Sequence, residues 1–123
     1  MNPTQKLRTQ AGNLWKQICF EKWGKKCELC GNPYLATPHH YYFKGSVPHL
    51  RYEVLNGIIL CCYCHAKLHF KDAKLVEEEI IKVRGKKWLK ELTKLKNNKP
   101  KYFKTNMKWY ESQIEKLKNE MQT

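Results

Sequence analysis

Residues 27–69 decide the fold, and they read CELCGNPYLATPHHYYFKGSVPHLRYEVLNGIILCCYCHAKLH. The stretch contains two Cys-x2-Cys pairs, Cys27/Cys30 and Cys61/Cys64. The N-terminal sequence is polar and shows no export signal, so we expect a reducing, cytoplasmic environment. In that environment two such pairs are typical of a structural Zn²⁺ held by four thiolates rather than of disulfides. A metal would also help to stabilise a chain of only 123 residues, of which 41% are hydrophobic.

The two remaining cysteines are expected to lie outside this metal site. Cys19 falls on a helix-like segment and is expected to be a small core residue. Cys62 lies inside the second Cys-x2-Cys pair and is expected to point away from the metal.

All five histidines of the chain also fall in this region, which suggests a second centre. His65 and His69 are four residues apart on a helix expected to begin at the second cysteine pair. That spacing places both rings on one face, where they can bind one ion, although packing or capping explains either residue equally well. His39 and His40 are neighbours in a predicted strand over 38–43, so their side chains point to opposite faces and cannot share one role.

The segment between the two strands adds three polar candidates. Asn56 precedes a second predicted strand over 57–60, where its amide can hydrogen-bond a loop or simply occupy a turn. Arg51 can clamp a phosphate through its planar guanidinium or pair with Glu53. His49 is expected to face solvent.

As a set, the motifs CELCG, PHHYYF and RYEVLNGIILCCYCHAKLH resemble those of HNH endonucleases, especially the small phage and prophage members. The resemblance covers residues 27–69, about a third of the chain, and it implies a bacterial host or phage-infected cell. It implies an α+β fold: a small ββα-metal (HNH/His-Me finger) core, stapled by the four-cysteine zinc site and flanked by α-helices.

The resemblance also implies roles for individual residues in nucleic-acid cleavage. His40 would be the general base that activates water, and Asn56 would brace the loop that orients it. Arg51 would be a catalytic residue that clamps the scissile phosphate, unless it pairs with Glu53. His39, His65 and His69 would hold one catalytic divalent ion, and the products would carry 5′-phosphate and 3′-hydroxyl ends. Imidazole ligands favour Mn²⁺, Ni²⁺, Co²⁺ or Zn²⁺ over Mg²⁺, but the supply of ions in the cell leaves Mg²⁺ open.

The sequence divides into three parts that differ in charge: a basic N-terminal helix (1–26), the nuclease-like core (27–70) and a basic helical extension (71–123). The first part contains six basic residues and one acidic residue, the core contains three and two, and the last part contains fifteen and eight. Hydrophobic periodicity predicts helices over 5–23, 72–84, 86–96 and 105–121. The last of these carries an apolar seam that either packs on its own chain or forms a homodimer.

The net charge of +13 favours a polyanionic partner, and double-stranded DNA fits best. Lys86, Lys87, Lys90 and Lys94 are candidates to follow a phosphate backbone, although a solvated lysine-rich surface gives the same pattern. We expect no membrane association, since no apolar run is long enough to span a bilayer. Two non-enzymatic alternatives are a zinc-containing nucleic-acid-binding module and an adaptor that recruits partners through residues 105–121.

Overall fold

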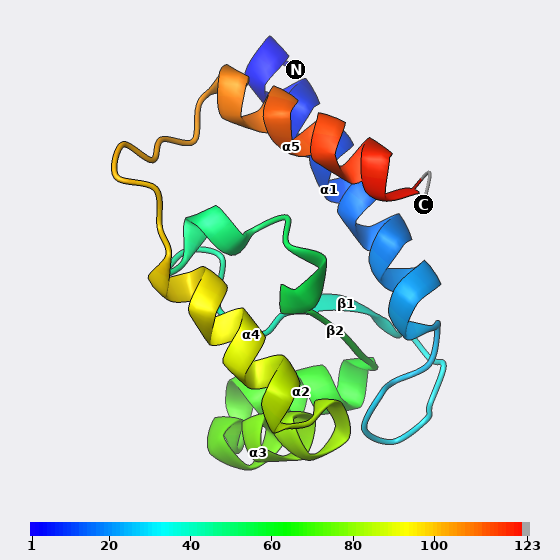
Figure 1. Ribbon diagram of the computed structural model, residues 1–123. Helices are drawn as coiled ribbons and strands as arrows, with labels where there is room; N and C mark the ends of the chain where they lie inside the picture. Colours follow the sequence, from blue (N-terminus) through cyan, green and yellow to red (C-terminus); the bar gives the residue numbers. More distant parts are fainter. Residues whose placement is uncertain (122–123) are drawn as a thin grey trace.

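The helices and strands lie close to where hydrophobic periodicity predicts them in the computed structural model, which describes residues 1–121 (Figure 1). In chain order the elements are α1 (Pro3–Trp23), β1 (Thr37–His40), two short 3₁₀ helices (Pro48–Leu50 and Val54–Asn56), β2 (Gly57–Leu60), α2 (Cys62–Phe70), α3 (Ala73–Arg84), α4 (Lys86–Asn97) and α5 (Met107–Met121). Helices joined to a small sheet and a four-cysteine cluster confirm the α+β class.

Polar side chains and one glycine set the helix boundaries. At the start of α1, Asn2 and Gln5 form a capping box in which each side chain accepts from the other's backbone N–H, at 2.8 and 3.0 Å. Asp72 caps α3 by accepting from the backbone of Leu75. Gly85, with φ of +94°, separates α3 from α4 in a conformation that glycine tolerates best.

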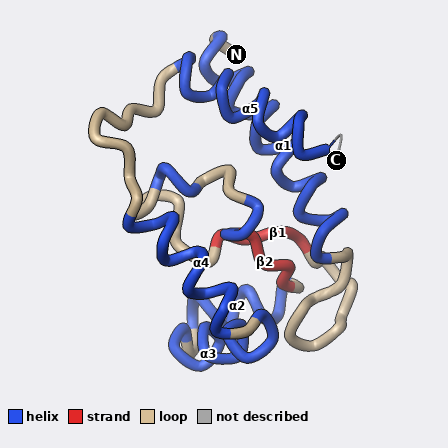
Figure 2. The backbone as a smooth tube through the Cα atoms, in the orientation of Figure 1, coloured by secondary structure: helices blue, strands red, loops and turns tan. Residues whose placement is uncertain are grey.

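The sheet consists of β1 and β2, paired antiparallel with His39 opposite Ile58 and His40 opposite Gly57 (Figure 2). The first strand is shorter than the predicted 38–43. It ends at His40 because the side chain of Asn56, rather than another strand residue, accepts from the Tyr42 N–H.

β2 is completely buried and separates two hydrophobic cores. Ile59 packs into the first core with α1 and α5, whereas Ile58 and Leu60 pack into the second core with α3 and α4. This division follows from the alternation of side chains along a strand. The short sheet therefore joins the helical pair to the cysteine-rich half of the molecule.

The first core joins the two ends of the described chain. α5 lies beside α1 and runs in the same direction (Figure 1). Tyr110, Ile114 and Leu117 of the predicted seam are buried in this core, so these residues pack on their own chain. Self-association through residues 105–121 stays a prediction.

A buried ion pair stabilises the cysteine-rich half of the molecule. Both carboxylate oxygens of Glu28 accept from Arg84, at 2.6 and 2.8 Å, and the Arg84 guanidinium lies 3.4 Å from the centre of the Trp23 ring. Arg84 also donates to the carbonyl of Gly57, and Glu28 accepts from the backbone of Ile59. These bonds connect the first cysteine pair, β2 and the ends of α1 and α3.

None of the helices in residues 1–121 combines the length and the apolar character of a membrane span.

Candidate metal centre and histidine cluster

The four paired cysteines meet at one point between the start of α2 and the loop that precedes β1. All four Sγ atoms of Cys27, Cys30, Cys61 and Cys64 lie within 4.8 Å of one another, and those of Cys30 and Cys61 are 3.6 Å apart. Tetrahedral zinc with Zn–S bonds of about 2.3 Å requires sulfur separations of about 3.8 Å. The cluster can therefore hold a metal ion such as Zn²⁺ with little rearrangement.

Backbone geometry prepares this centre for a metal. Gly31, with φ of +78°, turns the chain back after Cys30, and Cys61 caps α2 by accepting from the Cys64 N–H at 3.5 Å. Burial opposes ionisation of the Cys27 thiol, but hydrogen bonds from neighbouring backbone N–H groups outweigh it and lower its pKa from 9.0 to about 7. Burial raises the pKa of the neighbouring Cys64 thiol, and the pKa of Cys30 is also raised, so Cys27 is the thiol of these three that most readily forms the thiolate, which is the form that binds metal.

Cys62 and Cys19 lie outside the cluster, as predicted. Cys62 is half-buried on α2 and does not belong to the group of four, and Cys19 is completely buried in the first core.

His39, His65 and His69 form a second cluster between β1 and α2. The rings of His39 and His65 stack with centres 3.8 Å apart, and His69 lies edge-on to His65 at 4.4 Å. Burial, reinforced by the neighbouring His65 and His69, lowers the pKa of His39 from 6.5 to about 4. Burial also lowers the pKa of His65, and the neighbouring His69 lowers it further. Both rings are therefore neutral at pH 7, the protonation state that coordinates metal.

The three histidines are neighbours but are not arranged as a closed ligand set. Within residues 1–121, only the four cysteines bring three or more ligand atoms close enough to share an ion. Joint coordination by His39, His65 and His69 thus requires their ring nitrogens to move closer together, and it stays a prediction.

His40 points away from this cluster, as strand alternation predicts for neighbours. Its Nε2 lies 2.8 Å from the carbonyl oxygen of Arg51, and its ring stacks on Trp15 of α1 with centres 4.4 Å apart and planes 7° apart. Burial lowers the pKa of His40; the Arg51 carbonyl opposes this effect, while the cations of Lys44, Arg51 and Lys16 reinforce it. His40 is therefore held in one orientation next to several positive charges.

The side chain of Asn56 cross-links the segment between β1 and β2 by hydrogen bonds to its backbone. Its side chain is completely buried, accepts from the Tyr42 N–H at 2.8 Å, and donates to the carbonyls of Tyr42 and Leu50 at 3.1 and 3.4 Å. The backbone carbonyl of Asn56 accepts from Tyr41. Of the two interpretations of this residue, loop bracing therefore agrees with the structure.

We expect Asn56→Ala to lower the free energy of unfolding by about 2–4 kcal/mol, because three hydrogen bonds of about 1 kcal/mol each are removed and buried polar groups remain unpaired. Asn56→Asp is expected to cost more, since a carboxylate cannot donate to the two carbonyls and is charged in a buried site. Urea unfolding measures both. A loss below about 0.5 kcal/mol in both variants would contradict the bracing role, since that is the usual range of an exposed substitution.

The other candidates are Arg51, His49 and four lysines of α4. Arg51 does not pair with Glu53: its guanidinium lies 5.6 Å from the centre of the Tyr52 ring, and Glu53 pairs with Lys116 at 2.7 Å. His49 was expected to face solvent, and this expectation is wrong, because it is half-buried with Nε2 3.1 Å from the Leu95 carbonyl. The four lysines of α4 that were candidates to follow a phosphate backbone are all exposed: Lys86, Lys87, Lys90 and Lys94.

Sequence reasoning missed the part of the site that α1 contributes. Trp15 belongs to the predicted helix over 5–23 simply as one of its apolar residues, and its contact with His40 joins residues 25 positions apart. No local pattern reports such a contact.

Comparisons of the chain with protein family models, with curated proteins and with solved structures found no match.

Proposed function

We propose that the chain is a metal-dependent endonuclease of the HNH type that hydrolyses the phosphodiesters of DNA. One observation carries the proposal: two adjacent histidines on β1 have entirely different surroundings. His39 lies against His65 and His69, whereas His40 is fixed between Trp15 and the Arg51 carbonyl. This separation suits one histidine that binds metal and one that transfers a proton.

The hydrogen bond of His40 supports its role as the general base. A carbonyl oxygen can only accept, so Nε2 must carry the proton in the bond to Arg51. The neutral ring then has its lone pair on Nδ1, which can take a proton from an attacking water. Asn56 fixes the same connection on which the Arg51 carbonyl lies, and so acts as a positioning residue.

The donor set of the histidine cluster fits a divalent transition metal. His39, His65 and His69 would hold it as neutral imidazoles, which suit Mn²⁺, Ni²⁺, Co²⁺ or Zn²⁺ better than Mg²⁺. Such an ion, when bound, stabilises negative charge on the phosphate and on the leaving 3′ oxygen. The four-cysteine centre would have a structural role, because Cys64 directly precedes His65 and anchors the helix that presents it.

Incubation of purified protein with supercoiled plasmid, with and without each divalent ion, tests the proposal. Cleavage that depends on an added ion, and product ends that a ligase rejoins, are the expected result. No cleavage with any of Mn²⁺, Mg²⁺, Ni²⁺, Co²⁺ or Zn²⁺ on duplex or single-stranded DNA would refute it.

The second candidate is a non-catalytic zinc module that binds nucleic acid through its basic flanks. The observation that favours it is that, among the described residues, only the cysteines form a closed metal-binding group. DNA binding without cleavage, and one bound zinc with no second metal, would favour this candidate over the nuclease.

Either function predicts that α4 contributes to affinity through charge. Lys86, Lys87, Lys90 and Lys94 are exposed while Trp88 and Leu92 on the same helix are buried, so replacing all four lysines by glutamine leaves the core unchanged. Binding to unrelated duplexes should weaken about equally, and the log–log salt slope should become shallower by up to about 3.6, or about 0.9 for each phosphate that is no longer neutralised. Fluorescence anisotropy at several salt concentrations measures both. An unchanged slope would show that these side chains are merely solvated.

A further inference from the structure

A small basic cavity lies between α1 and the chain that follows β1. Its volume is about 280 Å³, and its lining includes His40 and four cations. Arg8 and Lys16 come from α1, and Lys44 and Arg51 come from the opposite wall. Within residues 1–121 no acidic residue lines it, whereas the cavity formed by the end of α1, the Glu53–Leu55 segment and Glu120 contains three glutamates.

The two walls of this cavity are fixed relative to each other. Trp15, which precedes Lys16, donates its indole N–H to the Glu53 carbonyl at 2.8 Å and stacks on His40. The guanidinium Nε of Arg8 donates to the Tyr110 hydroxyl of α5 at 3.2 Å. Four like charges around one cavity repel one another, so their common location is favourable when an anion neutralises them.

We propose that this cavity binds a backbone phosphate of a nucleic-acid strand, held by Lys16, Lys44 and Arg51, and that α1 thus forms one wall of the substrate site. Its volume is just below the usual range of roughly 300–1,000 Å³ for small-molecule pockets, and it suits a phosphate with part of its sugar. That the bound phosphate lies near the bond to be cut rests on the proposed function, since His40 lines the same cavity. Lys16 and Lys44, to which the sequence pattern gives no role, thereby take part in substrate binding.

Gly12 provides a way to fill the cavity without disturbing the fold. It lines the cavity from α1, and an added Cβ would meet no atom within 4 Å. A glutamate at this position would therefore extend into open space and place a negative charge among the cations. Because glycine is a poor residue for a helix interior, the substitution should not weaken α1.

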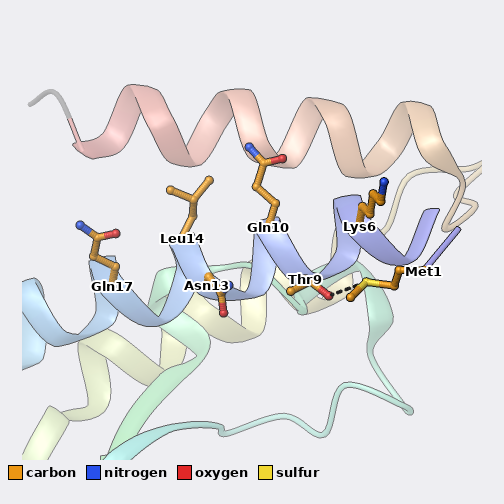
Figure 3. A pocket seen from close by; sticks show the side chains of 7 residues that line it. All are labelled: Met1, Lys6, Thr9, Gln10, Asn13, Leu14 and Gln17. Carbon is orange, nitrogen blue, oxygen red and sulfur yellow. Dashed lines mark hydrogen bonds between the residues drawn. The ribbon is translucent and has the colours of Figure 1, made fainter. Parts of the chain in front are cut away.

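The chain offers matched controls on the same helix. Lys6 and Gln10 line a neighbouring cavity of α1, and both point toward α5, away from Thr9 and Asn13 (Figure 3). Lys6→Gln makes the same charge change as Lys16→Gln. Gln10→Glu adds one negative charge, as Gly12→Glu does.

The test is the affinity of the full chain for a fluorescent 20-base-pair duplex, measured by anisotropy over a range of salt without added divalent ions. We expect Gly12→Glu to weaken binding roughly tenfold, and Lys16→Gln to make the log–log salt slope shallower by about 0.9. Lys6→Gln and Gln10→Glu should bind within twofold of the wild type. Circular dichroism and zinc content confirm that each variant is folded.

The outcomes separate this inference from the proposed function. Equal losses of affinity in the cavity variants and their controls would show that α1 attracts DNA only by overall charge and would overturn the inference. Wild-type binding by Gly12→Glu and Lys16→Gln would also overturn it, even if the plasmid is cut. Selective losses of affinity in a protein that cuts no DNA would sustain the phosphate site and refute only the nuclease.

Discussion

Replacing Cys61 by serine is expected to prevent metal binding at the four-cysteine cluster and leave a largely unfolded chain. Cys61 is completely buried, its thiol lies 3.6 Å from that of Cys30, and it also caps α2. Structural zinc sites contribute about 10–16 kcal/mol of binding free energy, which is also folding free energy. The free energy of unfolding of an ordinary domain is only about 5–15 kcal/mol in total, so a domain that loses most of the zinc contribution is expected to unfold.

Elemental analysis and far-ultraviolet circular dichroism measure the effect, with Cys62→Ser as the matched control. Cys62 is the next residue in the chain but does not belong to the cluster, so this variant should keep one zinc and its fold. A natively folded wild-type protein with much less than one bound metal ion, or a Cys61→Ser variant that unfolds at the wild-type temperature, would contradict the structural role.

The features that the sequence predicted correctly depend on local spacing. Two Cys-x2-Cys pairs lead to one four-sulfur centre because each pair fixes two ligands on a single turn of chain. The helices over 5–23 and 72–84 were predictable because their apolar residues recur with helical period and a polar cap or glycine bounds them. The opposite directions of His39 and His40 follow from strand alternation alone.

The features that it could not predict join distant segments. The Glu28–Arg84 ion pair spans 56 positions, and either residue alone resembles an ordinary surface charge. His49 appeared to be a loop residue because nothing nearby in sequence indicates that the Leu95 carbonyl will lie next to it. The basic cavity is a further case, since its cations come from α1 and from the connection between the strands, and only tertiary packing brings them together.

His40→Ala is expected to reduce metal-dependent cleavage by roughly 10²–10⁴-fold, the usual contribution of a general base. Zinc content should be unchanged, because His40 is bonded to the Arg51 carbonyl and does not belong to the four-cysteine centre. DNA affinity should also change little, since a neutral imidazole contributes no charge to phosphate binding. Single-turnover cleavage of a labelled duplex at saturating protein isolates the chemical step from binding.

Two further variants decide whether such a loss of activity reflects proton transfer or a disturbed loop. His40→Gln can still donate an N–H to the Arg51 carbonyl but has no basic nitrogen. It should therefore be as inactive as His40→Ala, while its free energy of unfolding should be closer to that of the wild type. His49→Gln is the matched control, because His49 makes the same kind of bond to a carbonyl, that of Leu95, outside the proposed site. We expect His49→Gln to cleave at the wild-type rate even where its stability falls. Cleavage by His40→Gln at near the wild-type rate would show that His40 only positions the loop, and the base would then have to be sought among His39, His65 and His69.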